Sequence, residues 1–169
     1  MKQLIAILLF TAVAQSWAHE THCLKEEKTL FSCLVGKQIA SICTSQDLSP
    51  TAGYMQYRYG SSGKVEISLP QPKEHPLKHV EADTYQAASG QNGSITFPHG
   101  AYAYTVYWES YRSDTNNSNG SSIWIEHAGL RISKGNAIVA DRKCASPTPG
   151  DHLAIDPYYL HNQVGFQEP

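Results

Sequence analysis

The sequence lacks the short motifs that define most enzyme active sites. It contains no Gly-x-Ser-x-Gly nucleophile motif, no glycine-rich phosphate-binding loop and no His-Glu-x-x-His metal motif. We therefore do not expect an enzyme; the alternative is a hydrolase whose site is assembled from residues far apart in the chain. Its carboxylates are scattered and form no recognisable acid–base pair: Glu66, Glu81, Asp83, Glu109, Asp114, Glu126 and Asp141.

Signatures of a metal or redox site are also missing. No Cys-x-x-Cys pair is present. Eight histidines are many for this length, but Pro76 separates His75 from His79 and disfavours the helix that would bring their imidazoles together. His22 lies in a polar stretch, residues 19–27, which predicts a loose lead-in to the domain. We expect no metal ion and no cofactor.

Basic residues are too few for a nucleic-acid-binding surface. The chain carries 13 Lys and Arg against 15 Asp and Glu, a net charge of −2. Nucleic-acid binding requires concentrated positive charge, so this class of partner is not expected. A mildly acidic protein is compatible with a cationic protein partner.

Apolar runs long enough to cross a membrane are absent, and the most apolar stretch lies at the N-terminus. Residues 4–14 follow the positive charge of Lys2 and fall well below the about 20 residues that a spanning helix needs. Ser16-Trp17-Ala18 then follows the small-x-small rule of signal peptidase. These features predict a bacterial-type signal peptide, residues 1–18, and a single domain, residues 19–169.

A lipid anchor is not expected, because Glu20-Thr21-His22 does not supply the small residues that lipid attachment at Cys23 requires. Loss of 18 residues and one lysine would leave 151 residues with a net charge of −3. That length is sufficient for one domain with its own core. We therefore expect a periplasmic or secreted protein without a membrane anchor.

Four cysteines in the predicted mature domain indicate two disulfides in an exported chain. Residues 28–34 and 38–44 predict a hairpin, with Cys33 beside the turn and Cys43 at the far end, more than about 10 Å away. A disulfide needs Cα atoms within about 7 Å, so a Cys33–Cys43 bond is not expected. The favoured pairing is Cys23–Cys43 with Cys33–Cys144, and Cys23–Cys33 with Cys43–Cys144 remains open.

The rest of the chain alternates between short strand-like runs and turn residues, without helical periodicity. Residues 77–93 show no clear pattern before a turn expected at 90–93. About eight short strands with close turns predict an all-β fold, an antiparallel β-sandwich or barrel stabilised by disulfides. Beyond the first hairpin, strands are predicted at 54–59, 64–69, 94–97, 101–111, 123–126, 129–133 and 137–140, and a short turn or helix at 152–162.

Aromatic residues are concentrated in the predicted strand 101–111. Alternation places Tyr102, Tyr104, Val106 and Trp108 on one face of this strand. One face is expected to pack in the core. Exposed tyrosine and tryptophan side chains are rigid and amphipathic, and they suit a binding face, including one for sugars.

The segment Phe97-Pro98-His99-Gly100-Ala101-Tyr102-Ala103-Tyr104 places a glycine and a tyrosine where a tight turn enters this strand. It resembles the Ser-Gly-x-Tyr loop of bacterial periplasmic lysozyme inhibitors, most nearly those directed at invertebrate-type lysozymes. Gly100 and Tyr102 match the motif, and His99 stands in place of its serine. The chain also resembles a wider set of uncharacterised exported proteobacterial proteins, a resemblance that implies no function. It is carried by Leu30-Phe31-Ser32-Cys33, Gln56-Tyr57-Arg58-Tyr59-Gly60 and Gly100-x-Tyr102-x-Tyr104.

The inhibitor resemblance implies a protein partner, a lysozyme, whose cleft receives the loop and whose two catalytic carboxylates meet its polar groups. Gly100 would allow close backbone approach, Tyr102 would supply a hydroxyl and a ring, and His99 would donate a hydrogen bond. The alternative is a structural or envelope-associated exported protein without enzymatic activity. That alternative predicts that residues 98–102 pack against their own domain.

Overall fold

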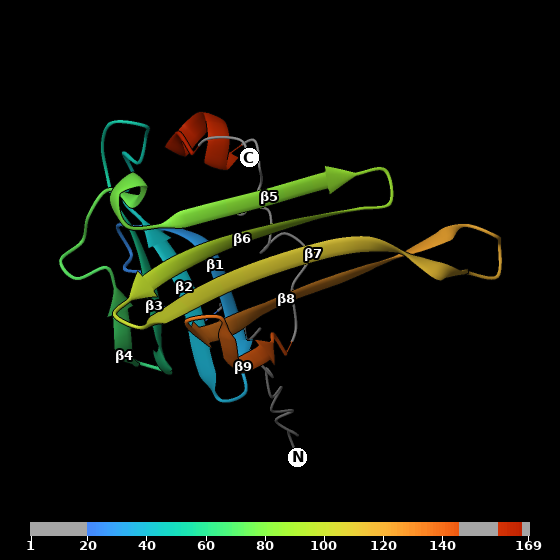
Figure 1. Ribbon diagram of the computed structural model, residues 1–169, viewed down its shortest axis with the longest axis horizontal. Helices are drawn as coiled ribbons and strands as arrows, with labels where there is room; N and C mark the ends of the chain where they lie inside the picture. The colour runs from blue at the N-terminus through green and yellow to red at the C-terminus, as the bar shows by residue number, and fades with distance from the viewer. Residues whose placement is uncertain (1–19, 146–158, 167–169) are drawn as a thin grey trace, which may run out of the picture.

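The computed structural model describes residues 20–145 and 159–166, so the predicted signal peptide, residues 1–18, lies outside the described part. The described chain is almost entirely β-structure, folded as two antiparallel sheets that form a sandwich (Figure 1). The predicted all-β, disulfide-stabilised fold is confirmed. Within the described ranges, no helix has the length and apolar character that crossing a bilayer requires.

The first sheet is a meander in the order β1-β2-β3-β4. Gly36 and Gly63, in its two hairpin turns, have φ angles of 66° and 72°, a conformation that glycine adopts without steric cost. Both predicted hairpins are therefore confirmed. The strands are β1 (Lys28–Val35), β2 (Gln38–Thr44), β3 (Met55–Ser61) and β4 (Lys64–Leu69).

The second sheet is a five-stranded meander in the order β5-β6-β7-β8-β9. Its longest strands, β7 and β8, have 15 and 13 residues, whereas β1 and β4 of the first sheet have 8 and 6. The strands are β5 (Glu81–Ala87), β6 (Gly90–His99), β7 (Tyr102–Asn116), β8 (Ser122–Lys134) and β9 (Ala137–Lys143).

One stretch left without a prediction is a strand, and two local predictions for the second sheet are wrong. The unpatterned residues 77–93 contain β5, an edge strand whose side chains are exposed or half-buried and so show little apolar alternation. The turn expected at 90–93 lies at Ala88-Ser89. The break at His127-Ala128, between the strands predicted at 123–126 and 129–133, is part of continuous β8, where buried Ala128 faces the larger Trp108 in the register.

The core lies between the sheets and is centred on Tyr57 of β3. Its ring centroid lies 5.6 Å from that of Phe97 and 5.9 Å from that of Tyr104, so aromatic side chains of both sheets meet there. Val106 and Trp108 are buried in the same core, so one face of β7 packs in the core as expected, although Tyr102 on that face is exposed.

A π-helix, Tyr159–Val164, completes the core from the C-terminal side. Leu160, Val164 and Phe166 are buried in the main hydrophobic cluster. The helical segment predicted within 152–162 is therefore present at its C-terminal end, and residues 152–158 lie outside the described part.

The Tyr57 hydroxyl is buried and has no hydrogen-bond partner among the described residues, and burial raises the pKa of this phenol well above its usual value. Such a group costs about 1–3 kcal/mol. Tyr57→Phe keeps the ring and removes the group, so we predict a free energy of unfolding about 1 kcal/mol higher, measured by urea unfolding. Tyr57→Leu should be less stable than the parent. A destabilised Tyr57→Phe would show that the hydroxyl is hydrogen-bonded in solution.

The second sheet extends well past the first (Figure 1). Beyond the core, the end of the β5–β6 hairpin, residues 86–91, and the end of the β7–β8 hairpin, residues 110–126, project from the molecule. We call this part of the sheet the overhang. The first sheet does not cover it on either face. The opposite end of β6 and β7 carries the turn that the sequence singles out.

Candidate functional site

The β6–β7 turn holds the three residues singled out by the inhibitor resemblance. His99 ends β6 and Tyr102 begins β7, and the two are partners in the register, so Gly100 and Ala101 form a two-residue turn. Gly100 has a φ angle of 60°, as a type II′ turn requires at its first central position. All four residues are exposed, Tyr102 to 40%. The turn therefore presents its backbone and both flanking side chains to solvent.

A second turn lies beside the first. The Gly135 backbone N–H donates a hydrogen bond to the Ala101 carbonyl oxygen at 3.2 Å. Lys134, the partner of Tyr102 in the register, places its ammonium over the Tyr102 ring, 5.5 Å from the ring centroid, within cation–π range. We call residues 99–102 with Lys134 and Gly135 the loop tip. The sequence does not reveal Lys134, because its position beside Tyr102 depends on how β7 and β8 pair.

The loop tip is a cluster of hydrogen-bond donors. It combines the His99 imidazole, the Tyr102 hydroxyl and the Lys134 ammonium, and an ammonium is a donor without acceptor capacity. No residue of the loop tip carries a carboxylate. The arrangement therefore favours an anionic partner group.

The polar lead-in is fastened to the first sheet, so the prediction that it is loose is wrong for its described residues, 20–27. Cys23 is bonded to Cys43 of β2. His22 is buried; its backbone N–H donates to the Ser41 hydroxyl at 3.0 Å, and its Nε2 lies 3.1 Å from the Gly60 carbonyl oxygen. These polar groups can be buried because each has a hydrogen-bond partner.

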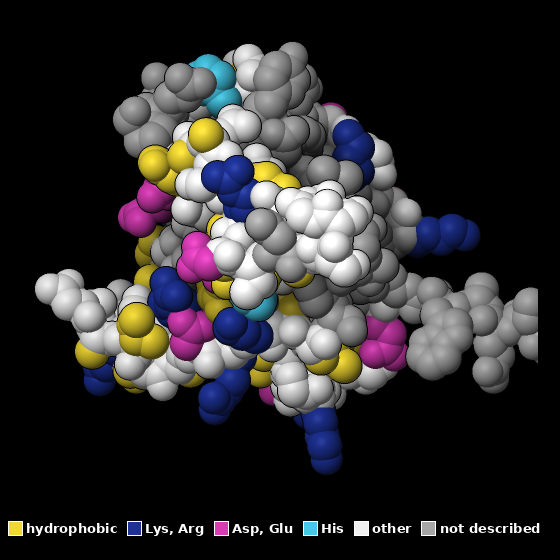
Figure 2. Space-filling view, turned by 90° about the vertical axis from the view of Figure 1, so that its right-hand side faces the viewer, with side chains coloured by type: hydrophobic (Ala, Val, Ile, Leu, Met, Phe, Trp, Pro, Cys, Tyr) yellow, Lys and Arg dark blue, Asp and Glu magenta, His cyan; other side chains and the backbone are white. Residues whose placement is uncertain are grey.

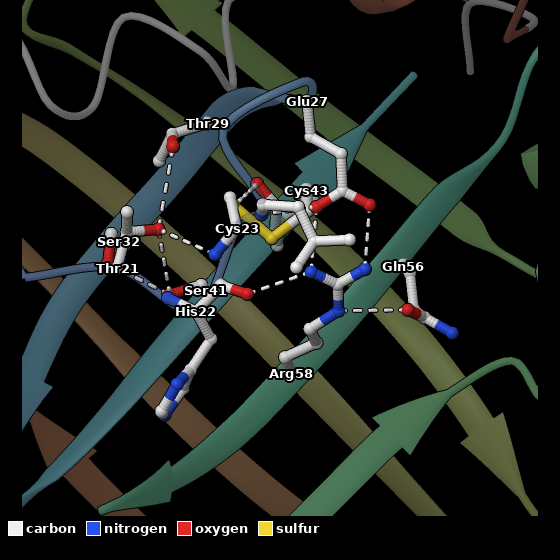
Figure 3. Close-up of a disulfide and its surroundings, with 12 residues drawn as sticks. Thr21, His22, Cys23, Glu27, Thr29, Ser32, Ser41, Cys43, Gln56 and Arg58 are labelled. Atoms are coloured by element: carbon white, nitrogen blue, oxygen red, sulfur yellow. Dashed lines mark hydrogen bonds and ion pairs between the residues drawn. A yellow bond between two sulfur atoms is a disulfide. The ribbon is translucent and has the colours of Figure 1, made fainter. Parts of the chain in front are cut away.

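A buried ion pair lies beside this disulfide (Figure 3). The Arg58 guanidinium donates two hydrogen bonds of 2.7 Å to the two carboxylate oxygens of Glu27, whose side chain has no exposed surface. Burial would raise the pKa of Glu27, but hydrogen bonds outweigh it and hold that pKa well below its usual range. The donors are Arg58, Tyr54, Lys73 and the Leu24 backbone. The nearby sulfurs are joined in a disulfide and offer no thiolate to a metal.

The lowered pKa of Glu27 makes stability depend on pH. The folded-state pKa lies below the unfolded value of about 4.3, so the carboxylate stabilises the fold fully above that pH and loses this contribution as the pH falls below it. The stability difference between the parent and Glu27→Gln should shrink by up to about 1.4 kcal/mol per pH unit below about pH 4. Urea unfolding from neutral pH downward measures it. A difference that stays constant with pH would contradict the prediction.

The second disulfide joins the two sheets. Cys33 of β1 is bonded to Cys144, the residue after β9, so both bonds follow the pairing that hairpin geometry favours. The Ala145 backbone N–H also donates to the Leu34 carbonyl oxygen at 2.8 Å. The disulfide and this backbone hydrogen bond therefore hold the same two segments together.

Two of the scattered carboxylates lie around one depression on the outer face of the second sheet. Glu109 and Asp141 line a depression of about 410 Å³ together with Tyr107, Arg131 and Lys143. Asp141 accepts hydrogen bonds of 2.9 Å from the Tyr107 hydroxyl and from Arg131. Burial, followed by the bond to Asp141, raises the pKa of Tyr107 to about 12. The Asp141 carboxylate is therefore engaged by Tyr107 and Arg131. This does not favour Glu109 and Asp141 as the acid and base of a hydrolase.

The structure brings His99, Gly100 and Tyr102 together at the loop tip and distributes the four cysteines over two disulfides elsewhere. A scan against protein-family models, a search of curated proteins and a search of solved structures give no match to this chain. The geometry of the surface features is thus the basis for a functional proposal.

Proposed function

We propose that the protein is a periplasmic or secreted binding protein that inhibits a lysozyme by inserting the loop tip into the active-site cleft. The exposed two-residue turn of Gly100 and Ala101, flanked by His99 and Tyr102, carries this proposal. Two residues are among the shortest connections between antiparallel strands, and a narrow projection suits a cleft. Exposure of these residues also favours a binding role over a purely structural one.

The chemistry of the loop tip is complementary to a lysozyme cleft. Lysozymes use two carboxyl groups, one as general acid and one as nucleophile or charge stabiliser. The donors of His99, Tyr102 and Lys134 would engage those groups in charge-assisted hydrogen bonds. Gly100, which has no Cβ, lets the backbone approach closely. Occupied carboxyl groups cannot act on the glycan.

The two disulfides also support this proposal. Both disulfides are of the kind that persists in oxidising compartments and is rare in the cytosol. A periplasmic or secreted inhibitor would meet an attacking lysozyme before that enzyme reaches the glycan.

The test is clearance of a peptidoglycan suspension by invertebrate-, chicken- and goose-type lysozymes. We expect the mature protein to inhibit one class, and His99→Ala/Tyr102→Ala to weaken that inhibition about a hundredfold. Each central contact contributes at least about 1.4 kcal/mol, a factor of ten. Lys134→Ala should weaken inhibition less, because its side chain flanks the turn.

Two exposed residues outside the loop tip provide matched controls. Tyr85→Ala removes a tyrosine of β5, and Lys37→Ala removes a lysine at the β1–β2 turn; both should inhibit as the parent does. Failure to inhibit any class at a large molar excess would overturn the proposal. Full inhibition by the His99→Ala/Tyr102→Ala variant would overturn the role of the loop tip.

A further inference from the structure

The inner face of the overhang carries a row of polar side chains that runs across four strands. The row arises because its members are successive partners in the register: Gln86, Gln91, Ser110 and Glu126. Trp124 lies two residues from Glu126 on β8 and therefore on the same face. The five side chains line one depression of about 310 Å³.

The polar row offers hydrogen bonds suited to hydroxyl groups. The amides of Gln86 and Gln91 and the hydroxyl of Ser110 each donate and accept, and the Glu126 carboxylate accepts. Sugar hydroxyls also donate and accept, so each can pair with this row. The described residues that line the depression include no lysine or arginine, and Glu126 disfavours an anion. On the end of the molecule shown in Figure 2, the basic side chains are spread among acidic and hydrophobic ones.

Trp124 supplies the apolar part of this depression. Its side chain is 51% exposed, although tryptophan is on average strongly buried in folded proteins. A pyranose ring has a flat face of C–H groups bordered by hydroxyls, and an indole ring offers a large flat apolar surface with one polar edge. The ring and the polar row lie on the same face of the sheet, so one ligand can contact both.

We propose that this depression binds a neutral saccharide, with Trp124 stacked on a sugar ring and the row from Gln86 to Glu126 hydrogen-bonded to its hydroxyls. The volume lies at the lower end of ligand sites, about 300–1,000 Å³, and fits a short stretch of glycan. The site is independent of lysozyme inhibition. Gln91 and His99 lie eight residues apart on β6, about 27 Å, so each site can be altered without touching the other.

The test is a nuclear magnetic resonance titration of the mature protein with triacetylchitotriose, cellotriose and maltotriose, three neutral trisaccharides that differ in linkage or acetylation. Saturable shifts are expected in the indole N–H signal of Trp124 and the side-chain amide signals of Gln86 and Gln91. Trp124→Ala should weaken binding about tenfold or more, equivalent to about 1.4 kcal/mol, and Gln91→Ala should weaken it less. Both side chains lie at the surface or half-buried, so the variants should fold.

Tyr85→Ala is the matched control. Tyr85 is a 61% exposed aromatic residue on β5 of the same overhanging sheet, but its alternation with Gln86 places it on the opposite face, so this variant should keep full affinity. Absence of shifts with all three saccharides at millimolar concentration would overturn the proposal, as would unchanged affinity in Trp124→Ala. Tighter binding of trigalacturonate, an anionic trisaccharide, would overturn the assignment of a neutral ligand. Lysozyme inhibition should be unchanged in Trp124→Ala, which separates the two proposals.

Discussion

Replacement of Arg58 by methionine is expected to lower the free energy of unfolding by about 3 kcal/mol. Methionine keeps much of the side-chain volume but leaves the buried Glu27 carboxylate without its main counter-charge. Removing one partner of a buried pair is costly because the other charge remains desolvated. The loss stays at the lower end of the usual range, because Tyr54 and Lys73 still donate hydrogen bonds to Glu27. Urea unfolding measures the change.

The matched control is the ion pair of Arg131 and Asp141. Its nitrogen–oxygen distance of 2.9 Å is similar, but the side chains are 42% and 37% exposed, so Arg131→Met should lower the free energy of unfolding by less than about 1 kcal/mol. The double variant Glu27→Gln/Arg58→Met should be more stable than Arg58→Met, because it no longer strands a charge. Equal losses in Arg58→Met and Arg131→Met would show that burial does not set the cost.

The first sheet could be predicted from sequence because its hairpins carry local signals. Gly36 and Gly63 mark turns that require positive φ, and the flanking residues alternate in the manner of strands. The first hairpin also limits the disulfide pairing, because it separates Cys33 from Cys43 and so disfavours a bond between them. Such features depend on neighbours in the sequence, and local patterns are sufficient to reveal them.

The features that could not be predicted from local sequence patterns depend on contacts between residues far apart in the chain. Residues 20–27 read as solvated because they are polar, yet Glu27 is buried through the donors that Arg58 and Tyr54 bring from β3 and the residue before it. Strand β5 lies at an edge and needs no apolar face. The His127-Ala128 pair resembles a break in the strand pattern, but it lies inside continuous β8, where Ala128 is paired with the much larger Trp108. None of these partners is adjacent in sequence.

The loop tip and the polar row also differ in how far they could be predicted from sequence. The turn at His99–Tyr102 could be predicted from Gly100, whereas Lys134 joins it only through the pairing of β7 with β8. The polar row beside Trp124 is formed from four strands, and its members lie up to 40 residues apart in the chain, from Gln86 to Glu126. A row of this kind exists only once the register of every strand in it is fixed.

Removal of the Cys33–Cys144 bond, by Cys33→Ala/Cys144→Ala, is expected to lower the free energy of unfolding by about 4–5 kcal/mol. The bond joins residues 111 positions apart, so its loss frees a long segment of the unfolded chain. The hydrogen bond from Ala145 to Leu34 holds the same region in the folded state. The variant should therefore keep its native structure and lose stability mainly through the greater entropy of its unfolded chain. Urea unfolding under oxidising conditions measures the loss.

The variant without the other disulfide, Cys23→Ala/Cys43→Ala, tests this explanation. Its bond spans 20 positions, so loop entropy predicts a smaller loss, by about 1.5 kcal/mol. A larger loss in Cys23→Ala/Cys43→Ala would contradict the entropic account. It would mean that the segment carrying Glu27 leaves the sheet when its bond is absent, and that Arg58 is then exposed to solvent. In that case Arg58→Met should cost much less in the variant without the Cys23–Cys43 bond than in the parent.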